Sequence, residues 1–182
     1  MPKLIKLIQG AAQPAAEWAE NTFVNVTDED AIPEAGDVIL SLTRFQAEGD
    51  ALLSSNSRRV GVRIEPAEEV EALAYDLPRI SVVALAFPKY RDGRAYTSAR
   101  LLRERFAYQG EVRAVGDVLQ EQAGFMVRCG FDAFEPNDGA EPEAWTKAAN
   151  RFRHVYQRAV DARPIAADER AQAQAQAKEG AL

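Results

Sequence analysis

A group of basic residues lies in the middle of an otherwise acidic chain. Between Phe87 and Arg105 the sequence has six basic and two acidic residues, whereas the whole chain has a formal net charge of -6. A local excess of positive charge attracts anions. This basic stretch therefore predicts a negatively charged ligand such as a phosphate or a sulfur oxyanion. Its basic residues are Lys89, Arg91, Arg94, Arg100, Arg103 and Arg105.

The loop after Phe87 contains the first residues that could hold an anion. Asp92 and Gly93 form a turn dipeptide, and Arg94 and Tyr96 follow at the expected start of a helix. The free N–H groups of a helix start and a neighbouring guanidinium can act on the same anion. The alternative is an ordinary solvated loop, in which Asp92 only forms the turn and Arg100 pairs with Glu104 one helical turn later.

A second pair of candidates lies around the next predicted strand. Arg113 is in the middle of EVRAVGD, and Asp117 comes directly after this strand. A buried strand tolerates a guanidinium only if it is paired or contacts a ligand. Arg113 could face a ligand pocket together with Asp117, or it could form a bridge to a carboxylate that fixes the sheet edge. The full candidate anion site is Asp92, Arg94, Tyr96, Arg113 and Asp117.

Other residue types give little support for known chemistries. Cys129 precedes a predicted helix-ending glycine, so we interpret it as a packing residue, and His154 is expected on a helix surface. Gln122 is interpreted as a helix-surface amide. One histidine, one cysteine and no ligand-spaced cluster predict no metal site. Neither GxGxxG nor GxxxxGK[ST] occurs. The sequence therefore assigns neither a cofactor nor a catalytic residue.

Composition limits the class of protein. A length of 182 residues, with 47% hydrophobic and 27% charged residues, suits one globular domain. The sequence pI of about 5.0 argues against nucleic-acid binding. The single cysteine excludes an intrachain disulfide, the N-terminal apolar run is too short for a signal peptide, and no run reaches the roughly 20 apolar residues of a membrane span. We therefore expect a cytoplasmic protein with no membrane partner.

The hydrophobic pattern predicts repeated strand and helix units. Short apolar runs predict five strands: Val38–Leu42, Val60–Ile64, Ile80–Phe87, Glu111–Val115 and Phe131–Phe134. Helical spacing predicts four helices. The first runs from Pro66 to Pro78, and the second passes through Ala99, Leu102 and Phe106. The third is opened by an Asp117–Gln120 capping box and ended by Gly130, and the long fourth runs from Pro142 past Phe152 and Tyr156 to Arg163. Four consecutive βα units result, and these favour an α/β fold with a mostly parallel sheet.

Two arrangements of such units remain open. One is an open three-layer sandwich, and the other is a TIM-like half-barrel. A half-barrel has an apolar inner face, which would require either dimerisation or the N-terminal segment as a cover. We expect a single α/β domain over residues 1–165, in which 1–35 form an N-terminal extension or an edge hairpin. The Ala/Gln-rich residues 166–182 are predicted to be a flexible tail.

Three blocks of the sequence resemble a known family. They are FPKYRDGRAYTSARLLRERF, YQGEVRAVGDVLQEQAGFMVRCGFDAFE and, more weakly, FRHVYQ. They are similar to the bacterial family known as domain of unknown function 934. The family's usual glycine after Asp-Gly-Arg is Ala95 here, and its usual serine is Thr97. Members commonly bear the label of an oxidoreductase involved in sulfite reduction, so the resemblance implies a link to that pathway.

The residues and the resemblance together leave three hypotheses. The first is an accessory protein of assimilatory sulfate or sulfite reduction, which binds a sulfur oxyanion, a sulfated nucleotide or sulfite reductase itself. The second is a TIM-like enzyme for a small phosphorylated or carboxylated substrate, with Asp92 or Asp117 as acid–base and with Arg94 and Arg113 as anion clamps. The third is a non-catalytic interaction module that forms a homodimer. The label implies an oxidoreductase, but the sequence contains no motif that would carry electrons.

Overall fold

The protein is a curled sheet with helices along one side. The computed structural model describes residues 2–8, 13–55, 57–161 and 163–179. In these residues, eight strands form a single mixed sheet with the order β2-β1-β8-β7-β6-β5-β4-β3. The strands are β1 (Leu4–Ile8), β2 (Ala15–Ala19), β3 (Phe23–Val26), β4 (Asp37–Ser41), β5 (Val60–Ile64), β6 (Val82–Phe87), β7 (Glu111–Gly116) and β8 (Ala133–Phe134).

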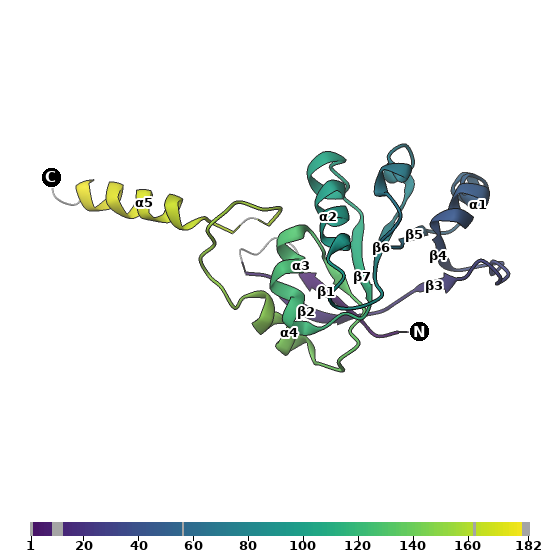
Figure 1. Ribbon diagram of the computed structural model, residues 1–182, viewed down its shortest axis with the longest axis horizontal. Helices are drawn as coiled ribbons and strands as arrows, with labels where there is room; N and C mark the ends of the chain where they lie inside the picture. The colour runs from purple at the N-terminus through teal and green to yellow at the C-terminus, as the bar shows by residue number, and fades with distance from the viewer. Residues whose placement is uncertain (1, 9–12, 56, 162, 180–182) are drawn as a thin grey trace.

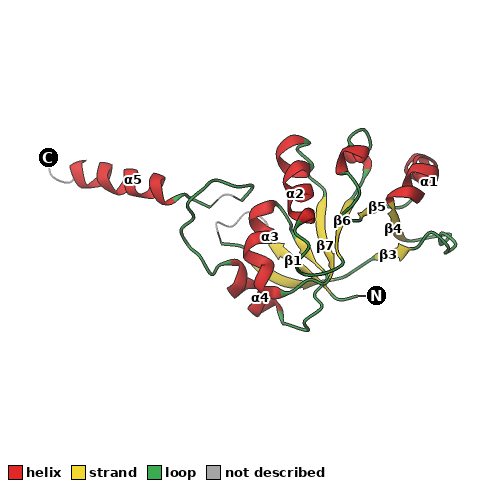
Figure 2. Cartoon of the chain, viewed as in Figure 1, coloured by secondary structure: helices red, strands yellow, loops and turns green. Residues whose placement is uncertain are grey.

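The order of the strands explains why the helices share one face. From β3 to β8 each strand is parallel to the next one along the chain, whereas β1 is antiparallel to both β8 and β2. Right-handed crossovers that always step in the same direction put their connecting segments on the same side of a sheet. The sheet is curled, and the helices that follow β4, β6, β7 and β8 cover its convex face (Figures 1 and 2). The prediction of an α/β fold is confirmed, and of the two arrangements left open the curled half-barrel is the one found.

The helices of the described residues are short, apart from the first and the last. They are α1 (Leu42–Ser55), α2 (Arg94–Arg100), α3 (Ala123–Cys129), α4 (Pro142–Ala149) and α5 (Ala166–Glu179). A π-helical turn, Leu101–Arg105, continues α2, and 3₁₀ turns occupy Val70–Leu73, Leu77–Arg79 and Gln120–Gln122. None of the helices in the described ranges is both long enough and apolar enough to cross a bilayer.

Two predictions for the first half of the chain were wrong. The expected helix from Pro66 to Pro78 is instead two short 3₁₀ turns, in which Val70, Leu73 and Leu77 are buried. The N–H groups of Ala72, Ala74 and Asp76 donate to carbonyls three residues back, which is the 3₁₀ pattern, and Pro78 has no N–H to donate. Helix α1 was not predicted, because few of its side chains are buried and Gly49 interrupts its pattern.

The long C-terminal helix was also predicted wrongly. Helix α4 ends at Ala149, and the Asn150 side chain caps it by donating to the Thr146 carbonyl at 2.8 Å and to the Pro14 carbonyl at 2.7 Å. Phe152 and Tyr156 are 66% and 89% exposed, so their spacing does not mark a buried face. The chain is irregular over residues 151–161 and 163–165, and α5 extends away from the sheet (Figure 1).

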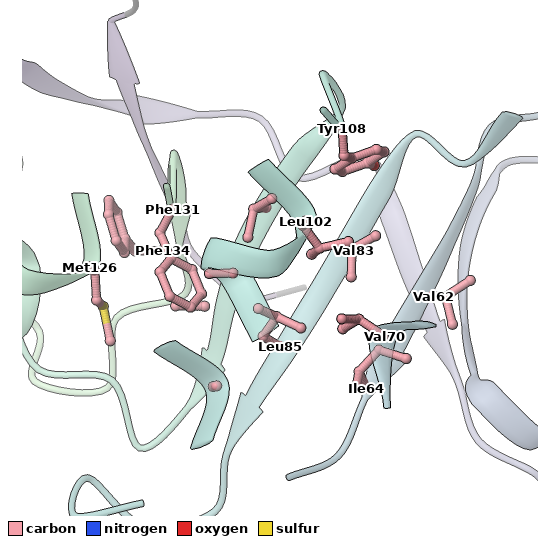
Figure 3. Packing of buried hydrophobic residues seen from close by; sticks show 14 of the residues in the cluster. Val62, Ile64, Val70, Val83, Leu85, Leu102, Tyr108, Met126, Phe131 and Phe134 are labelled. Atoms are coloured by element: carbon pink, nitrogen blue, oxygen red, sulfur yellow. The ribbon is translucent and has the colours of Figure 1, made fainter. Parts of the chain in front are cut away.

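The main apolar core fills the space between the convex face and the helices. Every residue of β6 is buried, as its uninterrupted apolar sequence predicts for a central strand. Figure 3 shows Val83 and Leu85 of this strand beside Leu102, with Met126 and Phe134 packed further along the sheet. This core fixes the strands whose carboxyl ends carry the candidate site.

A smaller apolar cluster lies on the concave face, where the N-terminal segment covers it. Its members are Phe23, Ile39, Val82, Ala84, Ala86 and Val115. Only residues 20–22 join β2 to β3, although these strands are the opposite edges of the sheet. Four peptide steps span at most about 14 Å, so the two edges must curl toward each other. Asn21 and Phe23 are both buried as a result.

Candidate functional site at the carboxyl edge of the sheet

Asp92, in the loop between β6 and α2, and Arg94, the first residue of α2, bind each other. Arg94 Nη2 lies 2.6 Å from Asp92 Oδ2, and Arg94 Nε donates to Asp92 Oδ1 at 2.9 Å. The hydrogen bond from Arg94 lowers the pKa of Asp92, and the same bond raises the pKa of Arg94. The Arg94 guanidinium therefore already has a carboxylate partner.

Two other cations of this loop have no such partner. Lys89 and Arg91 are exposed, and neither forms an ion pair with a carboxylate within the described residues. Arg91 Nε donates to the Tyr90 hydroxyl at 2.9 Å, and its guanidinium lies 5.4 Å from the centre of the Tyr90 ring. Tyr90 itself is 45% exposed. The loop thus presents two unneutralised cations and an aromatic ring to solvent.

Asp117 holds this loop in place from the neighbouring unit. Its Oδ2 accepts a hydrogen bond from the Tyr90 backbone N–H at 3.0 Å, and its Oδ1 accepts one from Asn137 Nδ2 at 3.3 Å. The loops after β6, β7 and β8 are therefore joined at one carboxylate. Both oxygens of Asp117 are engaged, so the structure gives this residue a positioning contact to the loop.

A glycine makes the position of Asp117 possible. Gly116 has φ +98°, and a Cβ on it would lie 2.5 Å from the Phe87 carbonyl oxygen. The Asp117 N–H donates to that same oxygen at 2.7 Å. Only a residue without a side chain allows the two strands' ends to approach so closely in this conformation.

Gln122 is the second clamp on the loop, contrary to its interpretation as a helix-surface amide. Its Nε2 donates to the Tyr90 carbonyl at 3.0 Å, and its Oε1 accepts the Leu119 N–H at 3.1 Å. The predicted capping box at Asp117 and Gln120 is wrong, because Gln122 provides the side chain that caps the Leu119 N–H. Backbone N–H and C=O groups of Tyr90 are thus both fixed, one by Asp117 and one by Gln122.

Tyr96 connects this cluster to the core. Its ring packs edge-on against Phe87 at 5.4 Å and against Phe131 at 6.2 Å between ring centres. Burial raises the pKa of Tyr96, and its hydroxyl forms a hydrogen bond with Gln122. The Tyr96 side chain is half-buried, so it packs between the loop and the core and does not project freely into solvent at the start of α2.

Arg113 belongs to a different part of the molecule. Its fully buried side chain lies on the concave face of β7, where Nε donates to Glu111 at 2.6 Å and Nη1 donates to Glu135 and Asn21, both at 3.0 Å. Of the two arrangements left open for Arg113, the carboxylate bridge is the one found, and Asp117 is not among its hydrogen-bond partners. The ring of Phe23, 5.6 Å away, covers the guanidinium.

The strand register extends this network across the concave face. Arg113 lies beside Ala84 on one side and Ala133 on the other, and the next positions outward are Arg63 and Lys6. Lys6 pairs with Glu111 at 2.6 Å, and Arg63 pairs with Glu65 at 2.7 Å. The three cations of this row are therefore neutralised by neighbouring carboxylates.

The structure thus divides the five predicted residues. Asp117 and Tyr96 meet through Tyr90 and Gln122, the Asp92–Arg94 pair lies on the exposed side of the same loop, and Arg113 is bound into the concave-face network. Sequence reasoning missed the support role of Gln122. Its only sequence signal was a polar residue three positions after Leu119 at a helix start.

The remaining reactive residue types are placed without a shared site. Burial raises the pKa of the Cys129 thiol, which makes it a poor nucleophile at neutral pH. His154 is exposed in the irregular segment and contacts Glu169 through Nδ1. In the described part of the chain, no group of three or more histidine, cysteine or acidic side chains could hold a metal ion.

Comparison with known proteins identifies the family. The family model described as "Bacterial protein of unknown function (DUF934)" matches residues 61–166, which is more than half of the chain. The matched region includes β5 except its first residue, strands β6 to β8, and every residue of the loop between β6 and α2. A search of curated proteins finds no match. The chain belongs to the bacterial DUF934 family.

Proposed function

We propose that this protein is an accessory of assimilatory sulfate or sulfite reduction, and that it binds an anionic partner at the loop 88–93. The observation that supports this proposal is the pair of exposed cations, Lys89 and Arg91, which have no carboxylate partner in the described residues. The link to the pathway rests on the family resemblance. The role implies a cytoplasmic location.

The loop is well suited to binding because it is fixed before a ligand arrives. The Asp117 and Gln122 clamps on Tyr90 hold the backbone between Lys89 and Arg91 on both sides. A preorganised loop loses less conformational entropy on binding than a free one. The two cations can form charge-assisted hydrogen bonds to an oxyanion, and the half-exposed Tyr90 ring can stack on a base.

Three ligand sources share this chemistry. Sulfite or sulfate would use the two cations alone, and a sulfated adenine nucleotide would also use the Tyr90 ring. An acidic surface of sulfite reductase would bury the whole loop. Because exposed cations bind a small anion weakly, we expect the nucleotide or the reductase to bind more tightly than sulfite or sulfate.

Calorimetric titration with sulfite, sulfate and adenylyl sulfate, together with retention of sulfite reductase on the immobilised protein, tests this function. The test variant is the double substitution Lys89→Ala/Arg91→Ala. The matched control is Arg100→Ala/Arg105→Ala, which removes the same charge from exposed positions of the same stretch. We expect loss of at least one of these interactions in the test variant only. If no ligand and no reductase binds, or if both variants lose binding equally, the proposal is wrong.

A barrel-type enzyme is the second candidate. It is favoured by the stepwise order of β3 to β8, since TIM barrels carry their chemistry on the loops at the carboxyl ends of such strands. Asp92 or Asp117 would be the acid–base, and Arg94 and Arg113 would clamp a phosphorylated or carboxylated substrate. It has less support, because Asp117 is engaged at both oxygens and Arg113 is paired with Glu111 and Glu135. Turnover of a phosphorylated or carboxylated substrate that disappears in both Asp92→Asn and Asp117→Asn would favour the enzyme.

A non-catalytic interaction module that forms a homodimer is the third candidate. The extended helix α5 and the exposed side chains of Phe152 and Tyr156 offer surface for a second chain (Figure 1). Light scattering distinguishes this role from the others, because a monomer at high protein concentration would exclude the homodimer.

A further inference from the structure

A pocket separate from the loop 88–93 lies beside the irregular segment that follows α4. Its volume is about 270 Å³, and none of its lining residues belongs to that loop. The walls combine positive charge, amide groups and apolar surface. The lining residues are Gln13, Asn150, Phe152, Arg153, Arg163, Pro164 and Glu169.

Arg163 is the buried charge of this pocket, and it is incompletely satisfied. Only 9% of the residue is exposed. Its Nε donates to Asp161 at 2.6 Å, and its Nη1 donates to the Phe152 carbonyl at 3.2 Å. Its Nη2 is buried and has no hydrogen-bond partner within the described residues. A buried donor without an acceptor costs free energy, so an acceptor that reaches Nη2 from the pocket would relieve that cost.

The other walls define the charge and shape of such a ligand. Arg153 is exposed and has no carboxylate partner in the described ranges, whereas Glu169 contacts His154. Arg163 is paired with Asp161, so Arg153 provides the positive charge that remains available to a ligand with one negative charge. Phe152, with 66% of its surface exposed, and Pro164 provide apolar contact area. The Asn150 amide is held by the Thr146 and Pro14 carbonyls, so that wall is rigid.

We infer that this pocket binds a small organic carboxylate with an apolar body. The carboxylate accepts hydrogen bonds from Arg163 Nη2 and from the Arg153 guanidinium, and the apolar body packs on Phe152 and Pro164. Pockets for drug-sized molecules usually have volumes of roughly 300–1,000 Å³, so a volume of about 270 Å³ suits a molecule with a single ring or a short chain.

An NMR titration of the full chain with benzoate tests this site. Benzamide is the control ligand, because it has nearly the same shape and no charge. We expect saturable shifts of the Phe152 and Arg163 signals with benzoate, and at least about tenfold weaker binding of benzamide, since a charge-assisted bond contributes roughly 1.5–3 kcal/mol. Absence of saturable shifts, or equal binding of the two compounds, overturns the inference.

Substitutions then locate the site. Arg153→Ala should weaken benzoate binding at least about fivefold without unfolding the chain, because Arg153 is exposed and unpaired in the described part. Arg163→Gln is the second variant that should weaken benzoate binding, because glutamine removes the guanidinium but keeps part of the packing of the side chain. Lys147→Ala, on an exposed residue of α4 outside the pocket, is the matched control and should leave binding unchanged. Lys89→Ala/Arg91→Ala should also leave it unchanged, so failure here is distinguishable from failure of the proposed function. Equal binding by wild type and Arg153→Ala overturns the assignment.

Discussion

The two halves of the basic stretch differ in what their cations do. In the loop between β6 and α2, Lys89 and Arg91 are exposed and have no carboxylate partner in the described residues. In α2 and the π-helical turn after it, Arg100, Arg103 and Arg105 all pair with acidic side chains. A local charge of +4 therefore combines unpaired, exposed cations with ion-paired ones, and only the structure separates the two sets.

Arg103 is the extreme case of the ion-paired half. Its side chain is 13% exposed, and it donates to the carbonyls of Gly130 at 3.0 Å and Gly110 at 2.8 Å, as well as to Asp132 at 2.7 Å. It thereby ties the turn before β7 to the end of α3. The turn after α2 directs Arg103 inward, so this cation of the basic stretch does not face solvent.

The largest expected effect is the loss of this buried cation. Arg103→Ala leaves Asp132 and the carbonyls of Tyr108, Gly110 and Gly130 without their guanidinium donor, and breaking a buried pair in this way costs about 3–5 kcal/mol. Denaturant unfolding measures the change. Arg105→Ala is the control, because its side chain is 63% exposed and its pair with Glu71 is 3.5 Å long, so its cost should stay within about 0.5 kcal/mol. If Arg103→Ala and Arg105→Ala both lost only a little unfolding free energy, the contrast between the two halves of the basic stretch would be wrong.

Asp132, the partner of Arg103, gives a pH test. Burial raises its pKa from 3.8 to about 6, although Arg103 opposes the shift. Because the folded state then holds the proton more strongly than the unfolded state, this residue's contribution to stability decreases as pH rises from about 4 to about 6. The decrease is roughly 3 kcal/mol. The pKa of Asp92 in the loop is instead lowered by Arg94, so its contribution is present above its unfolded pKa and is lost as pH falls.

Unfolding free energies of wild type and Asp132→Asn at pH 4 and pH 7 measure this effect. The wild type should lose stability relative to the variant between these two values. Asp92→Asn should show a small difference of opposite sign below pH 4. A constant difference between wild type and Asp132→Asn at both pH values would show that the carboxyl does not titrate in this range.

The strands could be predicted from the sequence better than the helices, and the reason is burial. The predicted run Val60–Ile64 coincides with β5, and Ile80–Phe87 differs from β6 by two residues, because central strands buried on both faces have continuous apolar sequences. The helices rest on a convex surface and bury one narrow stripe. Their ends depend on local contacts, such as the Asn150 cap, which a hydrophobic pattern does not reveal.

For the candidate site, the sequence located the loops but not the partners. Asp117 and Tyr90 are 27 positions apart, and Arg113 and Asn21 are 92 positions apart, so their contacts depend on the curl of the sheet. Asp92 lies in the loop after β6 and Arg94 begins α2, as the sequence predicts. That the two bind each other depends on side-chain conformations, which spacing alone does not determine.

Substitution of Gly116 tests the close approach that lets Asp117 hold the loop 88–93 in place. Gly116→Ala should cost at least about 2 kcal/mol, because alanine is strained at φ +98° and its Cβ would meet the Phe87 carbonyl oxygen at 2.5 Å. Gly36→Ala is the matched control, since Gly36 has φ +95° with nothing within 4 Å of the added Cβ. It should cost only the conformational strain, about 1 kcal/mol. Equal costs in thermal or denaturant unfolding would mean that the close approach at Gly116 relaxes easily.

Removal of the two unpaired cations, Lys89 and Arg91, should have the smallest effect on stability and the largest effect on binding. Lys89→Ala/Arg91→Ala should change the free energy of unfolding by less than about 0.5 kcal/mol, because neither side chain has a carboxylate partner in the described residues to lose. The same variant should lose most of its affinity for adenylyl sulfate or sulfite reductase, and wild-type binding should weaken as salt is added, because exposed charges are screened. Unfolding and titration on one sample check both statements. A double variant that is destabilised as strongly as Arg103→Ala would assign Lys89 and Arg91 to the scaffold, and the division of the basic stretch would then be wrong.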